Sequence, residues 1–239
     1  MNRYPQPATE VLPGPRAAAE LDADARGAFV VKTYAHLFAA ILAFVGLEIF
    51  LFGSGMAEPI ARAMLSVSWL IPLGAFMVVS WLASRIAGSA DSIGLQYLAL
   101  FGFVVAQALI FVPLLFMANM FAPGVIQSAA LLTAIGFTGL SAVAFVTRKD
   151  FSFLRGIVFW GFIVALVAIV GASLFGFALG TFFSVAMIGL AGAAILYDTS
   201  NVLHHFPEDR YVAGALQLFA SVALLFWYLI NLLMSFSSD

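Results

Sequence analysis

The chain has no cysteine and very little charge: only 9% of its 239 residues are Asp, Glu, Lys or Arg. Without cysteine there is no disulfide framework, thiol nucleophile or Cys-ligated metal. Ten Lys and Arg against twelve Asp and Glu leave no basic face for nucleic acid. Hydrophobic residues make up 64% of the chain, too many for a soluble globule of this length. The composition therefore predicts a polytopic protein of the lipid bilayer.

Residues 1–27 differ in composition from everything that follows. They carry mixed charges and no apolar segment, together with Pro5, Pro7, Pro13 and Pro15. This composition predicts a mobile polar tail. The first apolar stretch begins near Phe29, too late for a cleaved signal peptide, so we expect the tail to stay attached. The predicted organisation is a tail, 1–27, and a transmembrane domain, 28–239.

About seven apolar stretches follow, each of roughly 20 residues, which matches a hydrocarbon layer of about 30 Å. Polar residues, Pro or Gly separate them. We therefore expect an all-α bundle of seven transmembrane helices. The predicted spans are Phe29 to Phe52, Val67 to Ile86, Ile93 to Met117, Pro123 to Val146, Leu154 to Phe175, a sixth after Gly180 that ends near Asn201, and Tyr211 to Phe236.

The basic residues predict the orientation of this bundle. With a cytoplasmic amino terminus and seven alternating helices, Arg62 is alone on the outer side. The inner side then holds Arg3, Arg16, Arg26, Lys32, Arg85, Arg148, Lys149, Arg155 and Arg210. This imbalance is the one that the positive-inside rule requires when the amino terminus is cytoplasmic. A last segment that dips into the bilayer and returns is an alternative, because Ser237, Ser238 and Asp239 offer no cation to count.

Asp198 is the main candidate for function, because an ionised side chain at membrane depth costs roughly 2.5 to 3.5 kcal/mol. It must face protein or water, and Tyr197, Thr199, Ser200 and Asn201 surround it with polar groups. A network of hydrogen bonds that ends the helix is the structural alternative.

Two further ionisable residues lie in the first span. Glu48 is within about a turn of the outer edge, so its carboxylate is expected to extend to the interface. His36 follows Lys32 by one turn and either forms a hydrogen bond at the inner boundary or takes part in ligand or proton binding.

Nothing in the sequence indicates an enzyme. The chain contains neither His-Glu-x-x-His nor Gly-x-Ser-x-Gly, the motifs of zinc proteases and serine hydrolases. His204 and His205 lie in a polar loop without a convincing acid partner. We therefore expect no catalysis.

Three segments carry a resemblance to a known family. They are Val146 to Ser152 (VTRKDFS), Ile195 to Thr199 (ILYDT), and Glu208-Asp209 followed by Ala215 to Phe219 (ALQLF). In order and spacing they resemble the Bax inhibitor-1 family, over about the second to the seventh helix. The resemblance implies a seven-helix bundle whose last helix is central, in the inner membrane of a bacterium.

Some bacterial members of that family are pH-sensitive calcium leaks, and the resemblance implies that function for this chain. Two acids, on the sixth and seventh helices, share protons there and oppose an arginine on the second. The first acid corresponds to Asp198, which would also be the calcium ligand. Ser221 stands in the place of the second acid, so a proton-sharing pair would need Glu48 or another acid. The arginine position falls near Ala83, and Arg85 is the nearest cation, about 200° further around the helix.

The resemblance also implies an alternative function, since other bacterial relatives restrain the membrane-anchored protease FtsH. A cytoplasmic tail suits that role. The expected partners are thus the lipid bilayer, calcium as a permeant ion without any resident cofactor, and a membrane protease. Our sequence-based hypothesis is a pH-sensitive cation leak or stress regulator in which Asp198 pairs with Arg85 until it is protonated.

Overall fold

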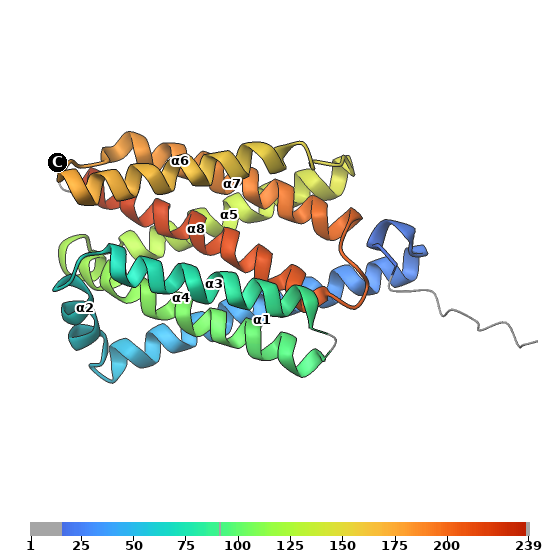
Figure 1. Ribbon diagram of the computed structural model, residues 1–239, viewed down its shortest axis with the longest axis horizontal. Helices are drawn as coiled ribbons and strands as arrows, with labels where there is room; N and C mark the ends of the chain where they lie inside the picture. Colours follow the sequence, from blue (N-terminus) through green and yellow to red (C-terminus); the bar gives the residue numbers. More distant parts are fainter. Residues whose placement is uncertain (1–15, 91, 238–239) are drawn as a thin grey trace, which may run out of the picture.

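The computed structural model describes residues 16–90 and 92–237, and this part of the chain forms a helical bundle (Figure 1). A short 3-10 helix, η1 (Ala18–Glu20), comes before the first long helix. The α-helices are α1 (Ala23–Gly53), α2 (Ala57–Leu65), α3 (Leu70–Ser89), α4 (Ile93–Phe121), α5 (Val125–Thr147), α6 (Leu154–Phe175), α7 (Gly180–His204) and α8 (Tyr211–Ser237). All but α2 are long and apolar enough to cross a membrane, which confirms the predicted all-α fold with seven spans.

Helix α8 lies at the centre of the bundle, as predicted for the last helix. It contacts α1, α3, α4, α5 and α7. In Figure 1 it runs between the pair α6 and α7 and the pair α3 and α4. Its buried side chains include Leu218 and Ile230, both without solvent exposure. Helix α6, in contrast, packs mainly on α7 and presents bulky side chains such as Trp160 to the surroundings. Side chains of α8 can therefore contact several other helices at once.

The predicted polar tail is only partly within the described residues, because 1–15 lie outside them. The prediction was wrong for the stretch from Arg16 onward. Helix α1 begins at Ala23, and the side chain of Asp22 caps it by accepting a hydrogen bond from the Ala25 amide at 2.8 Å. The Ala18 amide donates to the Phe206 carbonyl at 2.9 Å, which attaches η1 to the loop between α7 and α8. Capping and docking thus extend the ordered structure beyond the apolar span.

Helix α2 was not predicted, because its nine residues are too few to span a membrane. Ala57 and Ala61 are its buried residues, and they pack with Leu51 of α1 and Val112 of α4. On its exposed face, Arg62 forms an ion pair with Glu58 one turn earlier, at 2.6 Å. The i,i+4 spacing of this pair is typical of a surface helix. Helix α2 therefore covers the end of α1.

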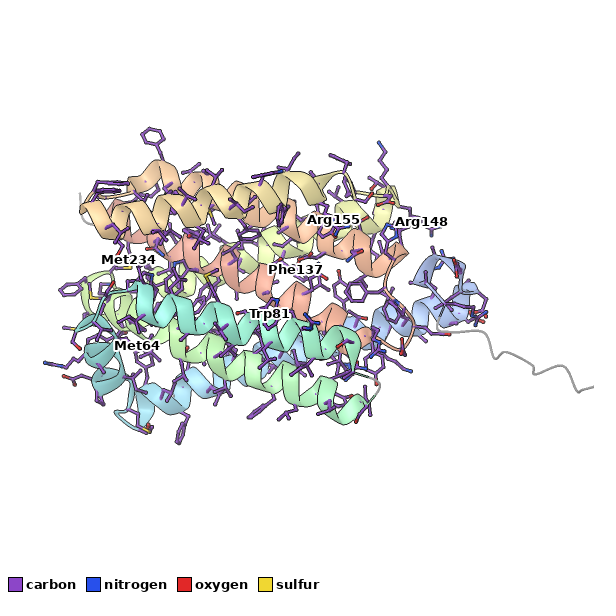
Figure 2. All side chains as sticks on the ribbon, in the orientation of Figure 1. Met64, Trp81, Phe137, Arg148, Arg155 and Met234 are labelled. Carbon is purple, nitrogen blue, oxygen red and sulfur yellow. The ribbon has the colours of Figure 1, made fainter. Side chains whose placement is uncertain are left out.

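The two ends of the bundle differ in their side chains. Figure 2 places Arg148 and Arg155 at the end where η1 lies, and Met64 and Met234 at the opposite end. Helix α8 is continuous over 27 residues and ends far from η1 (Figure 1). Within the described residues, α8 is thus one continuous candidate span that does not turn back. Which end faces the cytoplasm stays a prediction from the basic residues.

Candidate functional site

Asp198 is enclosed in the bundle, with 4% of its surface exposed. The Nε2 atom of Gln217 donates a hydrogen bond to Oδ1 at 2.5 Å, and Oγ of Ser221 donates to Oδ2 at 2.5 Å. Both donors belong to α8 and lie four residues apart, so one face of that helix serves both carboxylate oxygens. Hydrogen bonds of this kind to a charged acceptor are short and strong. Asp198 thus joins α7 to the central helix.

The polar residues beside Asp198 in the sequence have other partners. Thr199 accepts a hydrogen bond from the Tyr34 hydroxyl of α1 at 3.4 Å. Ser200 accepts one from the backbone amide of Phe151, in the loop between α5 and α6, at 2.9 Å. Helix α7 continues to His204, so Asp198 does not end it. The predicted polar surroundings of Asp198 are therefore real, but the donors that contact its carboxylate come from α8.

A cavity of about 420 Å³ opens beside this carboxylate. Asp198 is the only charged residue among the described residues that line it. Polar lining groups are contributed by α3, α4, α7 and α8: Ser80, Ser84, Gln107, Tyr197, Gln217 and Ser221. The remaining lining is mostly apolar and aromatic, with Trp69, Phe76 and Trp227 among it. The arrangement is a single acid in a cavity whose described lining is otherwise uncharged and mostly apolar.

The predicted pair between Asp198 and Arg85 is not present. Arg85 is exposed, and its guanidinium lies over the ring of Trp81, 5.5 Å from the ring centroid. Ala83, near which the resemblance places the family's arginine, is buried at 5% exposure. The two positions lie about 200° apart around α3, so a cation at 85 points away when 83 faces the core. Asp198 is compensated by neutral donors instead.

Glu48 does not extend to the interface, and that prediction was wrong. Its side chain is buried with 8% exposure, and neither carboxylate oxygen has a hydrogen-bond partner among the described residues. The physical reason is α2, which packs on α1 and α4 and covers the end of α1 where the side chain was expected to emerge. Glu48 is also not among the residues that line the cavity of Asp198. It does not replace the missing second acid there.

His36 lies in a small polar cluster between α1 and α4. Its Nδ1 atom is 2.6 Å from the Lys32 carbonyl oxygen, and its Nε2 atom is 2.8 Å from the Tyr97 hydroxyl. The ring of Tyr211, the first residue of α8, is 5.0 Å away between centroids. This is the hydrogen-bonded arrangement considered from the sequence. A role in ligand or proton binding is not tested by it.

Two contacts were missed in the sequence. Gln217 was not predicted as a site residue. It lies four residues before Ser221 and therefore on the same face of α8. His205 was thought to lack an acid partner, but its Nε2 atom lies 3.1 Å from Oδ2 of Asp150. The backbone amide of Ser152 donates to Asp150 and, ahead of the nearby His205, lowers the pKa of this carboxyl. This exposed pair joins two loops at the end of the bundle where Arg148 lies.

The described residues contain no group of three or more His, Cys, Asp or Glu side chains that could hold a metal ion. Asp198 would therefore contribute the one carboxylate to a bound cation, with hydroxyl and amide oxygens as its neighbours. Calcium prefers six to eight oxygen ligands, so any calcium bound here needs water as well.

Comparison with known proteins connects this geometry to a family. The family model described as inhibitor of apoptosis-promoting Bax1 matches residues 26–238. A protein of Campylobacter jejuni is 30% identical over 223 residues, which cover 88% of this chain and 89% of that protein.

Other relatives match over about half of their length. The modulator of FtsH protease YccA of Escherichia coli K12 is 34% identical over 108 residues, 45% of this chain and 49% of its own length. A membrane protein of Vibrio cholerae is 32% identical over 116 residues, again about half of each chain at 46% and 50%. The same comparison includes an E. coli relative named as an inner membrane protein. The chain belongs to the Bax inhibitor-1 family of multi-pass membrane proteins.

Proposed function

We propose that this protein is a proton-sensitive cation leak of the bacterial inner membrane, with Asp198 as its switch. The observation that carries the proposal is the double hydrogen bond from Gln217 and Ser221 of α8 to a buried carboxylate on α7. Protonation, or a bound cation, removes the charge that makes these hydrogen bonds strong. The contact between α7 and the central helix then weakens, and the cavity beside it can widen.

The groups around Asp198 favour this role because none of them neutralises it permanently. Apart from Asp198 itself, the polar side chains among the described residues that line the cavity are hydroxyls and amides from α3, α4 and α8, with Tyr197 from α7 itself. No Lys, Arg or His is among them. A carboxylate without a fixed counter-charge is free to exchange a proton or a cation. The proposal involves no catalysis and no resident cofactor, and calcium is the permeant ion to test first.

Ion flux in reconstituted vesicles tests the proposal. The wild type, Asp198→Asn and Glu48→Gln are compared in vesicles loaded with calcium, and release is followed at a series of pH values. We expect pH-dependent release for the wild type and a pH-independent rate for Asp198→Asn. Glu48→Gln is the matched control, because it removes a buried acid that does not line the cavity. Identical traces for the wild type and Asp198→Asn would remove the leak.

A second function is favoured by one relative, the E. coli protein named as a modulator of FtsH protease. Regulation of such a protease would act through the end of the bundle where η1 lies. There the side chain of Arg26 donates to the carbonyls of Ala18, Ala19 and Leu21 at 2.9–3.1 Å. The Glu208 amide also donates to the Arg16 carbonyl at 3.1 Å, beside the loop between α7 and α8. Residues 16–21 are therefore attached next to that loop.

Co-purification with FtsH tests this second function. Three variants are compared with the full chain: a deletion of residues 1–15, Arg26→Ala, which releases η1, and Arg62→Ala as the control on the opposite end. We expect the first two to reduce the amount of FtsH recovered and Arg62→Ala to leave it unchanged. If the full chain recovers no FtsH, this function is wrong, whatever the flux experiment shows.

A further inference from the structure

The cavity beside Asp198 is amphipathic along its length. At one end lie Asp198, Gln217 and Ser221. At the other end the rings of Trp69 and Trp227 are stacked, with centroids 5.9 Å apart. Along α8, the lining runs from Gln217 to Tyr228, about 16 Å at about 1.5 Å per residue. A ligand that fills the cavity is thus elongated, with a polar head and an apolar body.

The cavity beside Asp198 has walls from helices that do not pack mainly on each other. Its walls include Phe76 of α3 and Phe162 of α6. Helix α3 packs on α4 and α8, whereas α6 packs mainly on α7, so these two walls do not close on each other. In Figure 1, α3 and α6 lie on opposite sides of α8. The side between α3 and α6 is thus the entrance that a ligand from the bilayer would use.

The charge of the polar end selects the head group. The two donors from α8 satisfy one direction of each carboxylate oxygen but supply no positive charge. The nearest basic candidate from the sequence, Arg85, lies over Trp81 outside the cavity. An anionic head would be repelled, and a neutral head would supply no positive charge to the acid. An ammonium group fits both the charge and the hydrogen-bonding capacity of Asp198.

We propose that this cavity binds a lipophilic primary amine that enters from the bilayer between α3 and α6. Its ammonium group pairs with Asp198, and its alkyl chain lies against Trp69, Phe76 and Trp227. The site uses the same carboxylate as the proposed leak but needs no ion to cross the membrane. Binding measured in nanodiscs, where there is no flux, therefore succeeds or fails independently of the leak.

The experiment measures binding of radiolabelled dodecylamine to the full chain in phosphatidylcholine nanodiscs, with empty nanodiscs subtracted. Unlabelled dodecanol and dodecyl sulfate serve as neutral and anionic competitors. We expect dodecylamine to displace the label at least about tenfold better than dodecanol, since the alcohol lacks the charge-assisted contact. Dodecyl sulfate should compete least. Equal competition by the amine and the alcohol would overturn the proposal.

Two matched pairs of variants locate the site. Asp198→Asn should reduce amine affinity to that of the alcohol, while Glu48→Gln, the other buried acid, should leave it unchanged. Ala220→Leu keeps the carboxylate but fills the cavity, and should reduce binding of both ligands. Its control is Ala134→Leu, in a second cavity of about 460 Å³ that is lined by Phe137 and other uncharged residues. If Ala220→Leu binds the amine like the wild type, or Ala134→Leu loses it, the assignment to this cavity is wrong.

Discussion

Asp198 and Glu48 are both buried acids in transmembrane helices, but the bundle treats them differently. Asp198 receives hydrogen bonds from Gln217 and Ser221, whereas neither oxygen of Glu48 has a partner among the described residues. A buried polar group without partners costs the full loss of its hydration. The comparison teaches that burial alone does not mark a functional acid. What distinguishes Asp198 is that a second helix supplies donors and that a cavity reaches it.

Removing both donors of Asp198 should give the largest effect on stability. The double variant Gln217→Ala, Ser221→Ala leaves the Asp198 carboxylate buried but removes both of its donors. Asp198 then resembles Glu48, which has none among the described residues. Because each hydrogen bond to a charged group contributes about 1.5–3 kcal/mol, the free energy of unfolding should fall by about 3–6 kcal/mol. The measurement is unfolding in mixed micelles, with Ser221→Thr as a control that keeps a hydroxyl. A loss below about 1 kcal/mol would show that these donors do not hold a charged group.

Glu48→Leu should change stability in the opposite direction. It replaces the unpartnered carboxyl with an apolar side chain between α1 and its neighbours. We expect the free energy of unfolding to rise by about 1–3 kcal/mol in the same assay. Glu58→Gln, on the exposed face of α2, is the control and should change it by less than about 1 kcal/mol. Destabilisation by Glu48→Leu would mean that this acid has a role that its surroundings do not reveal.

The smallest predicted effect on the free energy of unfolding is that of Asp150, an exposed acid outside the candidate membrane spans. Its pKa lies below the ordinary value of 3.8, mainly because the Ser152 amide donates to its carboxylate. A carboxyl whose folded-state pKa is lowered stabilises the protein above the unfolded pKa and loses this contribution as pH falls through the folded one. Asp150→Asn should therefore cost less than about 1 kcal/mol at neutral pH, and nothing well below pH 3.8. Unfolding of both proteins at the two pH values checks this, and a cost that grows on acidification would contradict it.

Much of the fold follows from the sequence because membrane spans are set by length and hydropathy. All seven predicted spans are found, and the structure changes mainly their ends. Helix α1, for example, begins at Ala23 because Asp22 caps it, and not at the first apolar residue. Helix α2 escaped prediction since a helix of nine residues leaves no signal of a span.

The candidate site was predictable in its centre and not in its contacts. Asp198 stands out because a charge at membrane depth is rare. Its donors lie 19 and 23 residues further on, and only the packing of α7 on α8 brings them to it. Ser221 was interpreted only as the neutral residue in the place of a second acid. Its hydroxyl nevertheless donates a hydrogen bond to the Asp198 carboxylate. The pair of His205 and Asp150, 55 residues apart, depends in the same way on how two loops meet.

The claim on which the account depends is that neutralisation of the Asp198 carboxylate releases α7 from α8. Infrared difference spectroscopy of the reconstituted protein, with and without Asp198→Asn, measures the protonation of this one group as pH is changed. The account predicts that the Asp198 signal and the calcium flux change together, with the same pH profile. A flux that responds to pH while the Asp198 carboxylate signal stays constant would contradict it.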